Sequence, residues 1–161
     1  MSAVIVEVKP QTDRYQDLLT VAGRLHQAQY IAAQPTHVDE SILLGAFHAQ
    51  HCVGFIRCFI QVIGSEEGRP ALQDTLGTPL REGYVEAFGV LPPYRRQGLG
   101  EGLQEHAIEL CTDRSCYQIR SRSPIDDTES YVSRLELGHA IQPSQQSNAY
   151  YFIKTLPQRR R

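Results

Sequence analysis

Apolar and polar residues alternate over residues 3–8, which predicts a β-strand with one buried face. After this strand, apolar residues recur every three or four positions, which is the spacing of a helix. Asp13, with Gln16 three residues later, predicts a helix start, and Pro35 places residues 31–40 in a loop. The helix is expected to fade near residue 30, and its apolar stripe comprises Tyr15, Leu18, Leu19, Ala22 and Leu25.

The middle of the chain indicates a hairpin followed by a long connection. Two strands are predicted at residues 41–48 and 52–63, with polar turn residues between them. Residues 64–82 are rich in glycine, proline and acidic side chains, and we expect one short helix at 71–76 within this connection. The next strand, residues 83–91, is stopped by two prolines.

A strong helix is predicted after Gly98, followed by a strand at residues 116–122. A short helix then begins at Asp126 or Asp127 and ends at Gly138, and residues 149–156 form the last strand. The order β-α-β-β-β-α-β-α-β predicts an α/β fold with a mixed sheet. Its strand–helix–strand unit, residues 83–122, should be a right-handed crossover with parallel strands.

Composition narrows the class of protein. The 161 residues fit a single domain, residues 1–161. Sixteen basic and 18 acidic residues give a net charge of −2, which argues against a nucleic-acid partner. The apolar runs are too short to span a membrane, and the first residues lack the pattern of a secretory signal, so we expect a cytoplasmic protein.

The cysteines and histidines point to no metal site. None of the four cysteines forms a Cys-x-x-Cys pair, so reduced thiols are expected rather than a disulfide scaffold. His48, His51 and Cys52 are close in sequence, but no fourth ligand has suitable spacing. We therefore predict no metal.

The segment from Val85 to Gly100 carries the chemistry, because a strand there enters a turn that opens a helix. Backbone N–H groups at a helix start lack partners within the helix and, with the helix dipole, favour a phosphate or pyrophosphate. Arg95 and Arg96 add positive charge beside Gly98. The alternative is that the glycines only permit a tight turn. No P-loop is present, and the glycine spacing misses the dinucleotide fingerprint by one residue.

The pattern Arg95-x-x-Gly98-x-Gly100 resembles the acyl-CoA-binding signature of the GNAT superfamily of N-acetyltransferases. The preceding strand, the Pro-x-Tyr before the arginines and the later Leu137-Gly138 also fit that family, and the element order matches over most of the chain. The resemblance implies a mixed, mostly antiparallel sheet in which one parallel strand pair splays apart, with helices on both faces.

The resemblance also implies acetyl-CoA as co-substrate. The backbone amides of residues 95–100 would hold its pyrophosphate, and the backbone of Phe88 and Val90 would pair with the pantetheine arm as an extra strand would. The implied cofactor-binding residues are Phe88, Gly89, Val90, Arg95, Arg96, Gln97, Gly98, Leu99 and Gly100.

Glu86 is the candidate general base, because strand alternation places it on one face with Phe88 and Val90. Alternatively, it binds the substrate ammonium or pairs with an arginine such as Arg120. Many family members have a tyrosine three residues before the Leu-Gly pair, where this chain has an arginine. Tyr131, one helical turn earlier, is the candidate general acid, with packing against the sheet as the alternative.

Arg120 and Arg122 alternate on a strand beside the expected cleft, where they either receive an acidic substrate or form a solvated face. Taken together, the residues and the resemblance predict an N-acetyltransferase in which a primary amine, of a small molecule or a peptide, attacks acetyl-CoA directly in a ternary complex. A homodimer is compatible with the resemblance. The alternatives are a non-catalytic acyl-CoA sensor or interaction module and, third, a nucleotide-binding protein.

Overall fold

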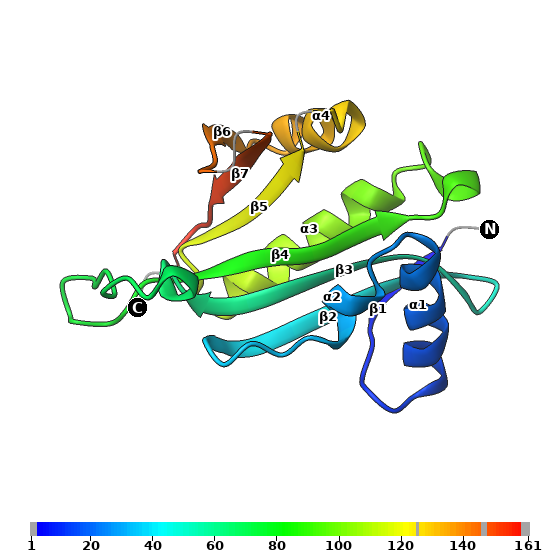
Figure 1. The fold of residues 1–161 in the computed structure, drawn as a ribbon, viewed down its shortest axis with the longest axis horizontal. Coiled ribbons are helices and arrows are strands. Elements are labelled where there is room, and N and C mark those ends of the chain that lie inside the picture. The colour runs from blue at the N-terminus through cyan, green and yellow to red at the C-terminus, as the bar shows by residue number, and fades with distance from the viewer. Residues whose placement is uncertain (1–2, 125, 146–147, 159–161) are drawn as a thin grey trace.

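The computed structural model describes residues 3–124, 126–145 and 148–158. Within them seven strands form one mixed sheet in the order β1-β2-β3-β4-β5-β7-β6 (Figure 1). The strands are β1 (Val4–Glu7), β2 (Val38–His48), β3 (His51–Val62), β4 (Arg81–Val90), β5 (Gln118–Pro124), β6 (Ala140–Pro143) and β7 (Ala149–Thr155). The helices are α1 (Asp13–Arg24), α2 (Ala28–Ala32), α3 (Leu99–Asp113) and α4 (Thr128–Glu136), with short 3-10 helices η1 (Ser65–Glu67) and η2 (Pro92–Tyr94).

Helices cover both faces of the sheet, as the sequence predicts. Helices α1 and α2 lie on one face and α3 on the other (Figure 1). The core has two clusters. In one, Leu18 of α1 packs with Phe55 of β3, and in the other, Leu103 of α3 packs with Ile56 of β3. The alternation of β3 therefore sends its side chains into two separate cores, which explains why this strand is apolar along nearly its whole length.

The parallel strand pair splays apart, as the GNAT resemblance implies. Strand β4 pairs with β5 only from Glu82↔Gln118 to Tyr84↔Arg120. Beyond that point β5 continues against β7, from Gln118↔Thr155 to Pro124↔Ala149. The second half of β4 thus has a strand neighbour on only one side, and its other edge is open to a ligand.

A β-bulge at Glu86 corrects one expectation. Cys58 pairs with Val85 and the neighbouring Arg57 pairs with Ala87, so Glu86 is an extra residue in β4. Ala87 then packs into the α1 cluster, while Phe88 and Val90 belong to the α3 cluster. Glu86 therefore does not share a face with Phe88 and Val90, because the bulge shifts the alternation between them.

The first helical region also differs from its prediction. Thr12, and not Asp13, caps α1, since the Thr12 hydroxyl accepts a 3.2 Å hydrogen bond from the Tyr15 backbone N–H. Helix α1 ends at Arg24, and α2 is separated from it by a turn in which His26 has a φ of 59°. Two short helices thus replace one that fades near residue 30.

The long connection before β4 contains no helix at residues 71–76, contrary to the prediction. Instead, Gln73 and Pro79 form a bridge, and an Asp74 carboxylate oxygen accepts hydrogen bonds from the backbone of Leu76 and Thr78. Local side-chain bonding of this kind competes with helix formation. The sequence analysis did not predict the edge strand β6, because all four of its residues are exposed and no buried positions alternate with exposed ones.

All four cysteines are buried and unpaired by disulfides, as expected for core thiols. In the described part of the chain, no helix has the length and apolar character needed to cross a membrane.

Candidate active site

A cavity of about 820 Å³ opens where β4 and β5 part. Its walls are the open edge of β4, the start of α3, the turn between α1 and α2, and α4. This volume lies in the range of cofactor and small-molecule sites. The lining residues are Leu25, Gln27, Phe88, Gly89, Val90, Arg95, Arg96, Gly98, Gly100, Glu101, Gln104, Asp127, Thr128, Val132, Ser133 and Glu136.

The start of α3 forms one end of this cavity. Gly98 is its N-cap with a φ of 80°, a left-handed conformation that glycine adopts without a steric penalty. Its carbonyl accepts the first helical bond, from Gly102 N–H at 2.9 Å, and no side chain caps the helix. The free amides of the first turn therefore face a cavity whose wall includes Arg95 and Arg96.

Seven of the nine residues expected to bind the cofactor line the cavity, whereas Gln97 and Leu99 do not. The Gln97 amide donates to the Pro93 carbonyl at 3.3 Å, and Leu99 packs against the α3 core cluster. Gly100 lets α3 pack closely against Phe88, since a Cβ there would come within 3.3 Å of the Phe88 ring.

The open edge of β4 is held by two side chains that the sequence analysis did not single out for this role. Gln27, in the turn between α1 and α2, pairs with the Phe88 backbone as a strand would. Its Nε2 donates to the Phe88 carbonyl at 2.9 Å, and its Oε1 accepts from the Phe88 N–H at 3.1 Å. The Arg95 Nε donates to the Val90 carbonyl at 2.8 Å. No local pattern could reveal Gln27, because Phe88 lies 61 residues away in the sequence.

Glu86 lies on the α1 and α2 face of the sheet, beside Arg57. The Arg57 guanidinium is buried and donates to the carbonyls of Tyr30 (2.8 Å) and Ala33 (2.6 Å) and to the Ser41 hydroxyl (2.9 Å). Burial raises the pKa of Glu86 above its usual value, and this shift is opposed by the nearby Arg57, Arg122 and His37. A raised pKa suits a carboxylate that accepts a proton near neutral pH.

Tyr84 is a half-buried residue two positions before the bulge, at the last pairing between β4 and β5. Burial raises the pKa of its phenol, against the opposing effect of Arg122 and Arg120, so the hydroxyl keeps its proton at neutral pH. The sequence analysis missed this residue. The one available signal was its spacing of two from Glu86 on the same strand.

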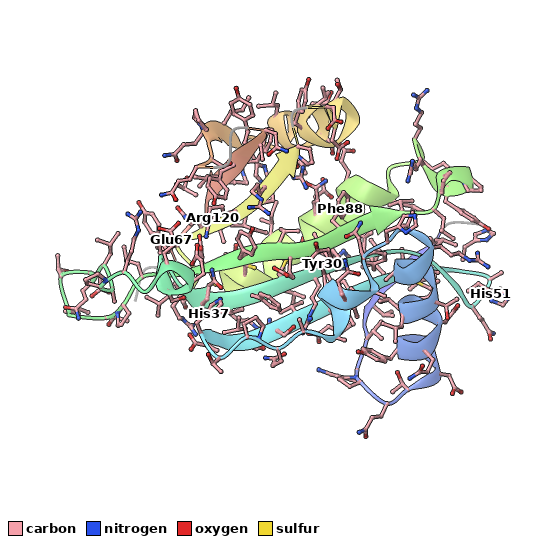
Figure 2. The ribbon with its side chains drawn as sticks, in the orientation of Figure 1. Tyr30, His37, His51, Glu67, Phe88 and Arg120 are labelled. Atoms are coloured by element: carbon pink, nitrogen blue, oxygen red, sulfur yellow. The ribbon has the colours of Figure 1, made fainter. Side chains whose placement is uncertain are left out.

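Arg120 corrects two expectations, since it neither forms a solvated face nor pairs with Glu86. Its Nη2 lies 2.6 Å from Glu82 Oε1 and 2.5 Å from Glu66 Oε1, and the Glu82 side chain is fully buried. Burial alone would lower the pKa of Arg120, but Glu82 and Glu66 raise it above its usual value. The guanidinium also lies 4.7 Å from the ring centres of Tyr84 and Tyr151. Figure 2 labels Arg120 on β5. Arg120 thus belongs to a structural ion-pair cluster in which two carboxylates already balance its charge.

Tyr131, the candidate general acid, is not among the residues that line the cavity. Its ring stacks on Phe152 with centres 6.0 Å apart, and its hydroxyl donates weakly to Thr128 at 3.4 Å. Arg134 is buried, with its guanidinium 5.8 Å from the Phe88 ring and 5.6 Å from the Phe152 ring. Burial lowers the pKa of Arg134 to about 10. Asp127 is the N-cap residue of α4, but its side chain makes no capping bond.

Comparisons with known proteins agree with this geometry. A model of the acetyltransferase (GNAT) family matches residues 10–127, well over half of the chain. The chain therefore belongs to the GNAT family of acetyltransferases, which are acyl-CoA-dependent N-acyltransferases that use acetyl-CoA as co-substrate. A search of curated protein sequences returns no match.

Solved structures with this fold include Arabidopsis thaliana NAA60 in complex with acetyl-CoA, with a TM-score of 0.75, 12% identity and coverage of 96% of this chain and 100% of that one. A GNAT-family acetyltransferase from Streptococcus pneumoniae has a TM-score of 0.68 and 16% identity, with coverage of 96% and 99%. Arabidopsis thaliana Naa50, bound to a bisubstrate analogue, has a TM-score of 0.67 and 19% identity, again with coverage of 96% and 99%. At these identities the likeness shows the fold.

Proposed function

We propose that this protein transfers the acetyl group of acetyl-CoA to a primary amine by direct attack in a ternary complex. One observation carries the proposal. The open edge of β4 begins at the bulged Glu86, and the cavity joins its later part, residues 88–90, to an uncapped helix start, with Glu86 outside the cavity lining. A long ligand with a phosphate group at one end and an amide-containing arm at the other fits this arrangement.

The cofactor would lie along the cavity. The first-turn amides of α3, from Gly98 onward, would bind its pyrophosphate, with Arg96 adding charge. The pantetheine arm would pair with the β4 edge at Phe88 and Val90. Because Gln27 and Arg95 occupy those backbone groups, the arm would have to exchange hydrogen bonds with both side chains.

The reaction needs one proton removed and one returned. Glu86, directly or through a water molecule, would take a proton from the amine as its nitrogen attacks the thioester carbonyl carbon. The tetrahedral intermediate would collapse by breaking the C–S bond, and the leaving thiolate would take a proton from water. The observed packing of Tyr131 on Phe152 gives no support to a proton transfer from that residue.

The direct test is a calorimetric titration with acetyl-CoA, using 3′-phospho-ADP as the ligand without the pantetheine arm. We expect clear binding of acetyl-CoA and weaker binding of the control, followed by release of free thiol when amines are added. No binding at millimolar acetyl-CoA would contradict the proposal. Binding without turnover of any amine would support the acyl-CoA sensor instead.

Replacing Gln27 by alanine tests where the arm lies. We expect acetyl-CoA to bind about fivefold more tightly, since two intramolecular hydrogen bonds, each worth about 1 kcal/mol at most, no longer compete with it. The affinity for 3′-phospho-ADP should not change, because that ligand does not reach Phe88. Calorimetry of both ligands on both proteins measures this, and an equal change for the two would place the arm elsewhere.

A further inference from the structure

Among the described residues, one cation near Glu86, Arg122, has no hydrogen-bond or ion-pair partner. Arg122 lies on β5 two residues beyond the last pairing with β4, so it stands where the two strands have parted. Its side chain is exposed, and within the described residues it has no hydrogen bond and no carboxylate within 4 Å. Arg120, two residues earlier, differs sharply because two carboxylates bind it.

Arg122 lies on the same face of the sheet as Glu86. Strand alternation places it on the side of Arg120, whose guanidinium stacks on Tyr84. Its charge acts on both the Glu86 carboxyl and the Tyr84 phenol. On this face α1 packs on β3 and α2 on β4, whereas α3 contacts β5 from the opposite face (Figure 1).

Two guanidinium groups, Arg57 and Arg122, lie near the Glu86 carboxylate. Arg57 is buried, 5% exposed, and its donors are taken by neutral oxygens of the protein. Arg122 is therefore the accessible guanidinium of the two, and a guanidinium binds a carboxylate through two parallel hydrogen bonds.

We propose that the acceptor is an amino carboxylate, whose carboxylate binds Arg122 while its amine lies at Glu86. This inference rests on the proposed acetyltransferase function. An amine without a carboxylate would leave the charge of Arg122 to solvent.

The test compares pairs of acceptors that differ only in this charge. Glycine, β-alanine, γ-aminobutyrate and a set of L-amino acids are each assayed beside the corresponding carboxamide, with acetyl-CoA and detection of free thiol. We expect kcat/KM to be at least tenfold higher for the best carboxylate than for its carboxamide. Arg122→Gln should raise KM for that carboxylate by 10-fold or more, with kcat retained, and leave the carboxamide unchanged.

Two further variants sharpen the result. Arg24→Gln removes an exposed arginine from the last turn of α1 that is not among the cavity-lining residues, and this variant should behave as wild type. Arg122→Glu should reverse the selectivity so that diamines become better acceptors than amino carboxylates. Loss of binding to one charge class with a retained kcat is a result that unfolding could not produce.

The outcomes distinguish failure of the amino-carboxylate acceptor from failure of the acetyltransferase function. Equal turnover of carboxylates and carboxamides, or an Arg122→Gln variant that affects both alike, would overturn the amino carboxylate and leave the acetyltransferase intact. No turnover with any amine would overturn the acetyltransferase function, and the acceptor class would fall with it.

Discussion

Replacing Glu86 by glutamine is expected to lower kcat about 100-fold while acetyl-CoA affinity stays within twofold of wild type. General bases contribute roughly 10²- to 10⁴-fold to rate, and glutamine keeps the size of the side chain but accepts no proton. Initial rates from thiol release and calorimetric titration measure the two quantities separately. A variant with unchanged kcat would exclude Glu86 as the base.

The pH profile gives the same test a second readout. Burial raises the pKa of Glu86, so activity of the wild-type protein should fall with decreasing pH at a value above the usual range of a glutamate, about 4.3. This limb should vanish in the glutamine variant. A raised pKa means that ionised Glu86 costs stability at pH 7, so the variant should unfold at the same temperature or higher. Glu67→Gln, in the exposed η1 turn, is the control and should leave both rate and profile unchanged.

Replacing Gly98 by aspartate is expected to weaken acetyl-CoA binding roughly 100-fold. Two like charges about 5 Å apart repel by about 3 kcal/mol at an effective dielectric constant of 20, and the new carboxylate would face the pyrophosphate. The fold should tolerate the change. A Cβ at Gly98 meets no atom within 4 Å, and aspartate adopts the left-handed conformation more readily than most residues.

Gly98→Asn is the matched control, since it has the same shape and backbone demands without the charge. We expect it to lose only a few-fold in affinity and to unfold at a temperature close to that of the aspartate variant. Calorimetric titrations at two salt concentrations measure the difference, which should shrink as salt screens the repulsion. If both variants bind acetyl-CoA equally well, the pyrophosphate does not lie at this helix start.

Much of the architecture could be read from local patterns. The hairpin of β2 and β3, the helix after Gly98 and the last strand all follow from hydrophobic periodicity and turn residues, whose causes lie within a few positions of each other. The same holds for the turn proposed to bind the pyrophosphate, where the Gly98 conformation and the uncapped helix are local properties. The predictions were wrong where local signals were weak. The exposed strand β6 was not predicted, and a helix was predicted where the Asp74 turn lies.

The catalytic surroundings could not be read in this way, because their partners are distant in sequence. The bulge that moves Glu86 to the α1 face arises from its register against Arg57 and Cys58, and a single residue of slip changes the face. Gln27 reaches Phe88 across 61 residues, and Arg120 meets Glu66 across 54. The two arginines of β5 look equivalent in the sequence, yet only the fold gives one of them two carboxylates.

The sequence by itself determined most of the order of elements, the glycine turn that opens α3 and the family resemblance, since each depends on neighbouring residues and on backbone preferences. The tertiary structure decided which carboxylates and cations meet. Arg120 is enclosed by Glu66 and Glu82 because β4 and β5 are still paired at that point, whereas Arg122 is exposed because the strands have separated two residues later. Charge pairing depends on distances of a few ångströms between residues far apart in the chain, and only folding sets those distances.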